Sequence, residues 1–303
     1  MNHENLLYKY VGLDECNRPR TDFLETESFR FTQRSLLNDP FETLPVIYPP
    51  NQYAEEDWDV AREEAIQNGN SNISKEDLER LYLKMPLRRY DEKSFATLYP
   101  RKIAEFGNKL VHSIEEYDEA KSEKVFSELR KELDKYGIFC LTESRENLVM
   151  WSHYAKDHKG LVMGFNRDQY FFSQNTPHEV EYSNRRIPIT INNGLVRVNG
   201  RTDSISLRFL FRKHTDWRYE KEWRLIKKLE DCKQFENNKD VYLFEIPSAA
   251  ISNITLGANM PQSEIERICS KIASDDRWSH LTIYKAELST KEYGLDFKQL
   301  LPA

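Results

Sequence analysis

Two glutamates separated by a single residue, Glu220 and Glu222, are the feature of this sequence with the clearest chemical potential. They lie in the run from Trp217 to Leu225, where arginines flank them and aromatic residues fill the gaps. Alternate side chains of an extended strand share a face, so this run predicts that both carboxylates and both arginines project to one side. Two interpretations stay open: a reaction site built on paired carboxylates, and a salt-bridged strand face.

A helix predicted over residues 147–158 is the second candidate, because it combines aromatic and imidazole side chains. It places His153 one turn before Asp157, so that the carboxylate can orient the imidazole. Trp151 and Tyr154 either line a pocket and stack on a planar ligand, or pack as a core-facing stripe. The histidine spacing and the absence of an HExxH motif disfavour a zinc site, and no metal is predicted.

Two cations near the start of the chain are candidate ligands for an anion. Lys9 precedes Tyr10 on a strand predicted at residues 6–11, and Arg30 lies on a strand predicted at residues 29–32. A lone cation that points inward from a strand needs a partner of opposite charge. That partner is either a carboxylate of the chain or a phosphate of a ligand.

The elements that must position these residues are distributed unevenly along the chain. Strand patterns gather at both ends, and a segment with helical periodicity, rich in Glu and Lys, lies between them at residues 50–136. We therefore predict a single α+β domain over residues 1–303, in which N- and C-terminal strands build a mixed sheet around a helical insertion at residues 50–136. The predicted strands are 6–11, 29–32, 138–142, 160–165, 179–182, 222–227, 241–246, 251–256 and 281–288, and further helices are predicted at 204–213 and 261–274.

Composition and motifs restrict the class of protein. Neither a GxGxxG nor a GxxxxGK[ST] motif is present, which disfavours a Rossmann dehydrogenase and a P-loop NTPase. The sequence shows no secretory leader and no apolar run of about 20 residues, so neither secretion nor membrane insertion is predicted. The four cysteines are scattered and form no CxxC pair, which favours a reducing, cytoplasmic location.

The net charge of −6 is distributed unevenly. Residues 185–228 contain twelve Lys and Arg against four Asp and Glu, a local balance of +8, so the remainder of the chain carries −14. A basic segment inside an acidic protein indicates one of two arrangements. It contacts phosphates of a nucleotide or a nucleic acid, or it forms a surface balanced by the acidic helices.

Four sequence blocks together resemble one protein family. They are LYKY at residues 7–10, NDPFE at 38–42, MWSHYA at 150–155 followed by GLVMGF at 160–165, and WRYEKEWRL at 217–225. In combination they resemble a large bacterial family of domains of unknown function, numbered 2971. The blocks cover most of the chain, so the resemblance predicts membership of this family.

A second resemblance is to the ADP-ribosyltransferase fold. Such enzymes begin with a short strand whose His or Arg holds NAD, and end with a strand opened by a catalytic Glu, often within an ExE pair. Glu220-Lys221-Glu222 is similar to that pair, and Glu222 opens a predicted strand. Lys9 stands where those enzymes have His, and Tyr10 follows it as in their HYT pattern. No STS strand is visible.

This second resemblance implies an NAD-dependent ADP-ribosyltransferase-like enzyme, of the kind used as a bacterial toxin or anti-phage defence effector, with a protein or nucleic acid as acceptor. Glu222 would stabilise the oxocarbenium character of the ribose, and Glu220 would orient or deprotonate the acceptor. The cations would contact the pyrophosphate of NAD, and the rings would stack on nicotinamide. The implied NAD-binding residues are Lys9, Tyr10, Arg30, Trp151, His153 and Tyr154.

Two other function classes stay open. The basic segment at residues 185–228 and the many aromatic residues favour a nucleic-acid-binding or nucleic-acid-processing defence protein, with salt-sensitive binding. If Glu220 and Glu222 only form ion pairs with neighbouring cations, the chain is a non-catalytic interaction module. The enzyme hypothesis requires the two carboxylates and Lys9 to share one cleft.

Overall fold

The computed structural model describes residues 5–44, 46–48, 123–124, 126–192, 195–198, 207–232, 234–236 and 241–301. The chain forms two compact units. Unit 1 consists of Met1–Asn38, Lys135–Tyr182 and Lys213–Ala303, and unit 2 consists of Asp39–Asp134 and Ser183–Arg212. The fold is α+β with a mixed sheet, which confirms the predicted class.

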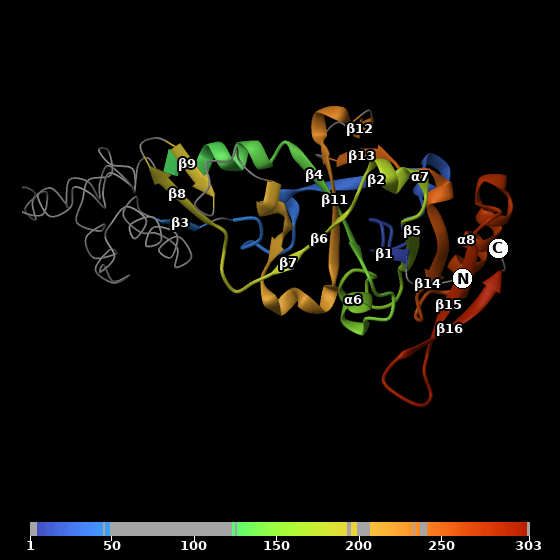
Figure 1. The fold of residues 1–303 in the computed structure, drawn as a ribbon. Coiled ribbons are helices and arrows are strands. Elements are labelled where there is room, and N and C mark those ends of the chain that lie inside the picture. Colours follow the sequence, from blue (N-terminus) through green and yellow to red (C-terminus); the bar gives the residue numbers. More distant parts are fainter. Residues whose placement is uncertain are drawn as a thin grey trace, which may run out of the picture. The chain divides into compact units, whose positions relative to one another are not determined.

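Unit 1 is built on a sheet of eleven strands, counted over the described residues (Figure 1). The main path is β12-β13-β2-β4-β1-β5-β14-β15-β16, while β11 pairs with β4 and β6. The strands are β1 (Leu6–Val11), β2 (Ser28–Gln33), β4 (Tyr136–Thr142), β5 (Leu161–Asn166), β6 (His178–Glu179), β11 (Glu222–Lys228), β12 (Gln234–Glu236), β13 (Val241–Glu245), β14 (Ile251–Leu256), β15 (Thr282–Leu288) and β16 (Leu295–Leu301). The N-terminal β1 lies between β4 and β5, so strands from both ends of the chain share one sheet, as predicted.

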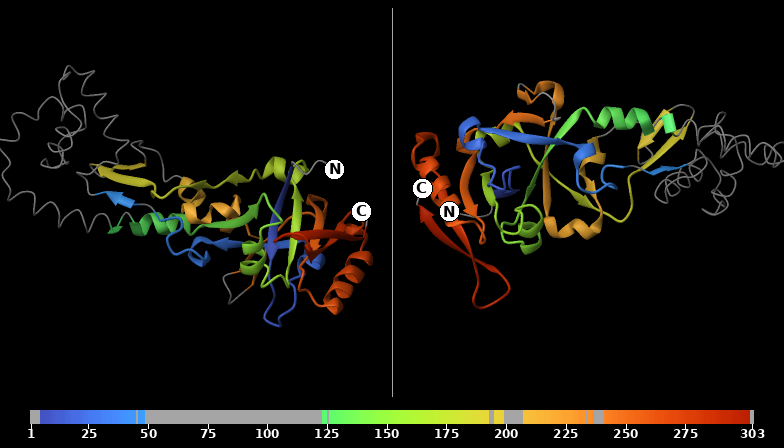
Figure 2. Two further views of the ribbon diagram at one scale, coloured as in Figure 1. Left: turned by 90° about the horizontal axis from the view of Figure 1, so that it is seen from below. Right: turned by 180° about the vertical axis from the view of Figure 1, so that it is seen from behind.

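Short helices surround this sheet. They are α1 (Phe23–Thr26), α6 (Leu148–His153), α7 (Tyr170–Gln174) and α8 (Gln262–Ala273), with the 3-10 turns η2 (Arg34–Leu36), η5 (Thr215–Glu220), η6 (Leu229–Asp231), η7 (Ser248–Ala250) and η8 (Asp276–Trp278). Helix α8 buries Ile265, Ile268 and Ile272, which recur at helical spacing. It connects β14 to β15, which run parallel, and Figure 2 shows it along one side of these strands. None of the helices in the described ranges is long and apolar enough to cross a membrane.

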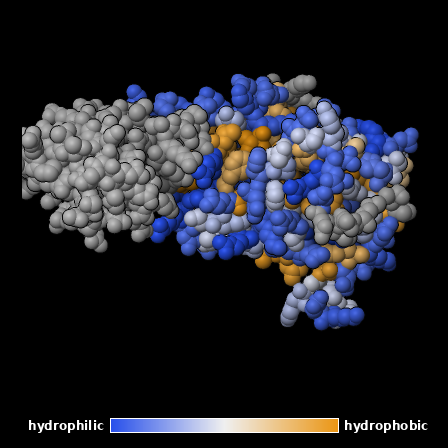
Figure 3. Space-filling view, viewed as in Figure 1, coloured by the Kyte–Doolittle hydropathy of each residue, from blue (hydrophilic) through white to orange (hydrophobic). Residues whose placement is uncertain are grey.

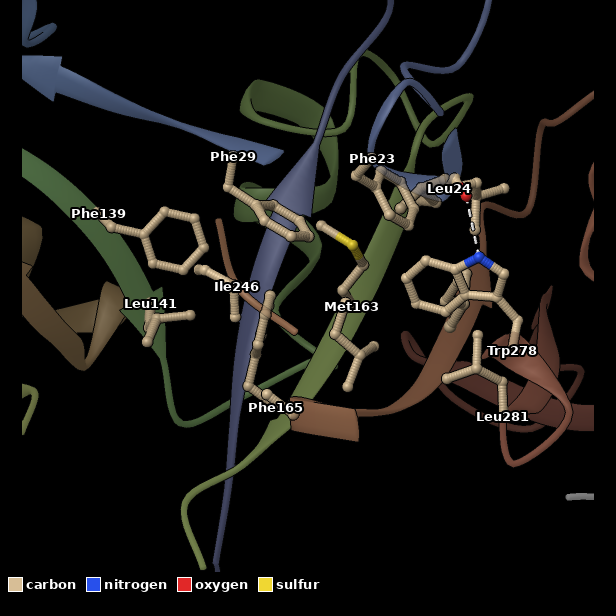
Figure 4. Packing of buried hydrophobic residues seen from close by; sticks show 14 of the residues in the cluster. Phe23, Leu24, Phe29, Phe139, Leu141, Met163, Phe165, Ile246, Trp278 and Leu281 are labelled. Carbon is tan, nitrogen blue, oxygen red and sulfur yellow. Dashed lines mark hydrogen bonds between the residues drawn. The ribbon is translucent and has the colours of Figure 1, made fainter. Parts of the chain in front are cut away.

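An aromatic core fills one face of the sheet (Figure 4). Phe139 of β4 lies at its centre, with ring centroids 5.1 Å from Phe31, 5.9 Å from Phe29 and 5.6 Å from Phe165. Each such pair adds roughly 0.5–1.5 kcal/mol to the free energy gained by burial. Phenylalanines from three strands therefore hold β2, β4 and β5 in register around β1.

A smaller core covers the other face of the sheet. Tyr8 and Tyr10 alternate with Leu7 along β1, so the tyrosines project away from the aromatic core. They pack with Met150 and Trp151 of α6. The centre of the sheet is thus buried on both faces, which explains why β1 reads as an almost continuous apolar and aromatic run.

The helix predicted at residues 147–158 is too long. Asn147 caps α6 by accepting a hydrogen bond from the Met150 N–H at 3.1 Å, but the helix ends at His153. The loop that follows is left-handed at Lys156, Asp157 and His158, with φ of 46°, 55° and 63°. Three consecutive left-handed residues reverse the chain into β5, so His153 and Asp157 do not share a helix face.

Unit 2 contains a three-stranded sheet of β3 (Val46–Tyr48), β8 (Pro188–Asn192) and β9 (Leu195–Val198). Strands β3 and β8 are parallel, and β8 and β9 are antiparallel. The described residues 126–133 are helical. Most of the helical insertion predicted at residues 50–136 lies outside the described residues, so it stays a prediction.

Two predicted elements take a different form. The helix predicted at residues 204–213 is wrong at its C-terminal end, where the 3-10 turn η4 (Leu207–Phe211) leads directly into β10 (Arg212–Lys213). The strand predicted at residues 179–182 is divided into β6 and β7 (Glu181–Tyr182). Val180 separates them, and its N–H donates a hydrogen bond to the Glu222 carbonyl at 2.9 Å.

Candidate functional site

The run from Trp217 to Leu225 is not a single strand, so the prediction of one strand face with four charged residues is wrong. Turn η5 ends at Glu220, Lys221 is left-handed with φ 44° and ψ 54°, and β11 begins at Glu222. The N–H of Lys221 donates to the Arg218 carbonyl at 3.2 Å and closes the turn. Strand alternation does not extend through such a turn.

The two carboxylates nevertheless meet, because both bind one lysine. Lys213 Nζ lies 2.5 Å from Glu220 Oε2 and 3.0 Å from Glu222 Oε2. Arg224 adds two hydrogen bonds, from Nε to Glu222 Oε1 at 2.8 Å and from Nη2 to Glu222 Oε2 at 3.0 Å. We call Lys213, Glu220, Glu222 and Arg224 the ion cluster. Each of these residues is at most 5% exposed.

Two tyrosines connect the ion cluster to its surroundings. Tyr154, which is partly exposed, donates its hydroxyl hydrogen to Glu220 Oε1 at 2.6 Å and accepts a hydrogen bond from Asn38 at 2.9 Å. The Tyr182 hydroxyl accepts a hydrogen bond from the Glu222 N–H at 2.8 Å. All four carboxylate oxygens of Glu220 and Glu222 therefore have partners within the chain.

The electrostatics of the ion cluster follow from burial and charge balance. Burial raises the pKa of Glu222, Lys213 lowers it and Glu220 raises it, and the net pKa is above the usual value. Burial alone would lower the pKa of Lys213, but Glu222 and Glu220 together raise it. Lys213 is therefore held charged, and Glu222 takes up a proton more readily than a free glutamate.

Cys140 of β4 lies beside the ion cluster and is not a reactive thiol. Burial raises its pKa well above the usual value, and the charge of Glu222 raises it further. A thiol held protonated is a poor nucleophile. All four cysteines are free. The described part of the chain contains no group of three or more His, Cys, Asp or Glu arranged to hold a metal.

An open pocket of about 550 Å³ lies at the turn between the two glutamates. It is lined by Glu143, Glu179, Val180, Glu181, Tyr182, Arg218 and Lys221. Arg218 and Lys221 are exposed, and neither forms an ion pair with another residue of the described ranges. This volume falls within the range of about 300–1,000 Å³ that is typical of small-molecule sites. We call it the turn pocket.

Lys9 does not join the carboxylates. Its Nζ donates to the Cys140 carbonyl at 3.1 Å and lies 4.2 Å from the Phe139 ring centroid. Tyr8 and Glu222 both pair with Thr142, so the next residue of β1, Lys9, projects to the opposite face of the sheet. Burial lowers the pKa of Lys9. The single cleft that the enzyme hypothesis requires is not present in this arrangement.

Tyr10 and Trp151 pack in the interior. The Tyr10 hydroxyl donates to the Ser144 carbonyl at 3.1 Å, and Trp151 Nε1 donates to the Arg145 carbonyl at 2.7 Å. The two rings meet edge to face with centroids 5.4 Å apart. Trp151 is fully buried and has no exposed ring face for a ligand. The role of these two residues in NAD binding stays a prediction, and their burial favours a packing role.

The remaining predicted residues separate from one another. His153 is exposed, and its ring centroid lies 6.4 Å from that of Tyr154. Tyr154 is the one predicted NAD ligand that contacts the ion cluster, through its hydrogen bond to Glu220. Arg30 is partly buried on β2, and its Nε has no hydrogen-bond partner among the described residues. Lys213 and Tyr182 were not singled out from the sequence, because no motif or periodicity relates them to Glu222 across the intervening turns.

The fold and site define an α+β protein in which a buried ion cluster supports the turn beside a polar pocket. Residues 150–225 match the family described as "Protein of unknown function (DUF2971)". The match confirms the first resemblance, and the matched segment contains most of α6, all of β5 and both glutamates. Searches of curated proteins and of solved structures returned no match. The resemblance to ADP-ribosyltransferases stays a prediction.

Proposed function

We propose that this protein is a binding module for a small phosphate-bearing ligand, with NAD as the first candidate, and that the turn pocket is its site. The observation that carries the proposal is the pair of exposed cations, Arg218 and Lys221, that line the pocket without a carboxylate partner in the described residues. Unpaired cations at a concave surface are suited to phosphate oxygens, and a guanidinium binds them bidentately.

Other groups of the turn pocket fit the rest of a nucleotide. Tyr182 is partly exposed and offers a ring for stacking. Glu179 is exposed and has no ion pair among the described residues, so its carboxylate can accept hydrogen bonds from ribose hydroxyls or from an amide. The mixture of cations and carboxylates favours a ligand that combines phosphate with hydrogen-bond donors, which NAD does.

The ion cluster has a supporting role in this proposal. Glu220 ends η5 and Glu222 begins β11, and both are bound to the same Lys213. The turn between them, which presents Lys221, is therefore held at both ends. A recognition turn fixed in this way loses little conformational entropy when a ligand binds.

Removing the two pocket cations is expected to weaken ligand binding. Arg218→Ala and Lys221→Ala each remove one charge-assisted contact, worth roughly 1.5–3 kcal/mol, so we expect affinity to fall about tenfold or more for each. Isothermal titration at low salt with NAD, ADP and inorganic pyrophosphate measures this effect. Lys291→Ala, an exposed lysine in the loop between β15 and β16, is the control for a change of net charge.

Four results would contradict the binding proposal. The first three are the absence of binding to all three compounds at low salt, equal affinity for the wild type and the two pocket variants, and an equal loss of affinity in Lys291→Ala. The fourth concerns which part of the ligand is recognised. Binding of NAD and ADP but not of pyrophosphate would show that the nucleoside supplies the affinity through Tyr182 and Glu179. The cations would then not carry recognition, and the proposal in its present form would be lost.

A second candidate function is ADP-ribosyl transfer from NAD. The favouring observation is that Glu220 and Glu222 flank Lys221 in the chain, that Lys221 lines the pocket, and that the pKa of Glu222 is raised. For Glu222 to face an oxocarbenium ion, its carboxylate would have to leave both Arg224 and Lys213. The complete pairing of both carboxylates favours binding over catalysis.

Nicotinamide release separates these two functions. If the protein is a binding module, purified wild type binds NAD but releases no nicotinamide, with or without added RNA, DNA or cell lysate. Release that Glu222→Gln abolishes, while the control Glu143→Gln retains it, would establish the enzyme instead. Glu143 is a suitable control because it lines the pocket, is exposed and lies outside the ion cluster.

A further inference from the structure

Strand β16 is the last strand of the sheet path, and no strand of the described residues pairs with its outer edge. In Figure 1 the loop between β15 and β16 projects from unit 1, and in Figure 3 this loop is mostly hydrophilic. The tip of the hairpin is therefore mostly polar, and Tyr293 is a fully exposed large side chain there. The feature available to a partner is the backbone edge of β16, which is a template for another strand.

The charges across the β15–β16 hairpin are poorly matched. Lys298 lies directly opposite Lys285, and Asp296 lies directly opposite Glu287. Like charges in directly opposite positions destabilise a strand pair. Lys285 turns away to bind the carbonyls of Gly257 and Ala258, but Asp296 and Lys298 remain exposed and have no ion-pair partner among the described residues. Strand β16 thus carries a negative charge at Asp296 and a positive charge at Lys298, two residues apart, and neither has an oppositely charged partner in the described residues.

We propose that β16 pairs antiparallel with β16 of a second copy of this chain, with Phe297 opposite Phe297 of the other copy. In this register Asp296 faces Lys298 of the second copy, and the two-fold axis repeats the pair. In the dimer, Asp296 and Lys298 therefore each lie opposite a residue of opposite charge, which neither has within the hairpin. No other partner is needed to explain the sequence of the strand, because the segment is complementary to itself.

The backbone geometry of the hairpin agrees with this register. Ser289 N–H donates a hydrogen bond to the Gly294 carbonyl at 3.0 Å. This bond fixes which residue pairs of β15 and β16 are hydrogen-bonded and which are not, because the two kinds alternate along an antiparallel ladder. By alternation, the N–H and C=O groups of Leu295, Phe297 and Gln299 point away from β15. These groups form the new ladder when Phe297 is at the centre. Asp296 and Lys298 then form non-hydrogen-bonded pairs, in which side chains lie closest.

Charge reversal tests the proposal. The wild-type chain is expected to form a dimer of twice 36.0 kDa at high concentration, measured by sedimentation or light scattering. Asp296→Lys and Lys298→Glu each turn both cross-copy pairs into like-charge pairs, so each is expected to raise the dissociation constant about tenfold or more. The double variant Asp296→Lys/Lys298→Glu restores complementary pairs and is expected to dimerise as the wild type does.

The same variants report on folding independently of assembly. Each single change places opposite charges across the hairpin itself, because Asp296→Lys sets a cation opposite Glu287 and Lys298→Glu sets a carboxylate opposite Lys285. The melting temperature, measured at a concentration where the protein is monomeric, is therefore expected to stay level or rise while the dimer is lost. A wild type that stays monomeric at all concentrations, single variants that dimerise normally, or a double variant that does not recover would each overturn the proposal.

Discussion

Lys213→Met is expected to lower the free energy of unfolding by about 3–5 kcal/mol. The substitution leaves Glu220 and Glu222 buried without the cation that both carboxylates bind. Methionine keeps most of the length and the apolar character of the lysine stem, so the lost charge accounts for most of the effect. Urea unfolding at neutral pH measures the change. The control Lys228→Met removes an exposed lysine of β11 and is expected to change stability by no more than about 0.5 kcal/mol.

The pH dependence of this variant gives a second check. Without Lys213, the pKa of Glu222 in the folded state rises further, because burial raises it and the cation that lowers it is gone. When the pKa of a carboxyl group is higher in the folded than in the unfolded protein, its contribution to stability is complete below the unfolded-state pKa. That contribution is lost as the pH rises through the folded-state pKa. The stability deficit of Lys213→Met is therefore expected to shrink at mildly acidic pH. An equal loss of stability at neutral and at mildly acidic pH, or no loss at neutral pH, would show that the stability of the ion cluster does not depend on the lysine charge.

Trp151→Ala is expected to destabilise unit 1 by about 3–5 kcal/mol. The indole is fully buried, packs against Tyr10 and His158, and donates to the Arg145 carbonyl. Truncation leaves a large cavity between α6 and the sheet. Urea unfolding of the variant beside His153→Ala, an exposed change on the same helix, isolates the effect of the cavity.

Trp151→Phe separates packing from ligand binding. It retains most of the ring volume and loses one hydrogen bond, so a smaller cost of about 1–2 kcal/mol is expected. If Trp151 only packs, the folded Trp151→Phe variant binds NAD with the affinity of the wild type. A Trp151→Ala variant as stable as the wild type, or a selective loss of NAD affinity in Trp151→Phe, would contradict the packing role. It would instead support the role in ligand binding that the sequence suggests for Trp151.

The strands of unit 1 could be predicted because their signals are local. Strands β1 and β14 have the predicted bounds, and β11 starts at Glu222 as predicted. In each case an apolar run is limited by a turn or by charged residues. Strand β16 was not predicted, because its alternation of apolar and charged residues covers only Leu295 to Lys298, which is too short to distinguish a strand from a loop.

The geometry of the site could be predicted only in part. Glu220 and Glu222 are neighbours in space, as the sequence suggests, but a left-handed Lys221 and a distant lysine bring this about rather than a shared strand face. A single left-handed residue of a type that usually avoids this conformation has no sequence signal. The position of Lys9 on the opposite face depends on how β1 pairs with β4, which only the complete sheet determines.

The basic segment at residues 185–228 illustrates the same limit. Lys213 and Arg224 contribute to its positive balance, yet both are buried and neutralised inside the ion cluster. A count of charges along the chain does not distinguish such residues from those free to meet phosphates. Nucleic-acid binding by this segment stays a prediction.

The central position of β1 has a consequence for the synthesis of the protein. Its partners in the sheet come much later in the chain, since Lys9 bonds to a residue 131 positions away. Leu24 accepts the hydrogen bond of Trp278 across 254 positions. Contacts between residues so far apart in the sequence make folding slow, because long loops must close before the native strand pairs can form. A nascent chain on the ribosome therefore exposes the apolar β1 until β4 and β5 have emerged, and unit 1 completes its core only after translation has passed β15.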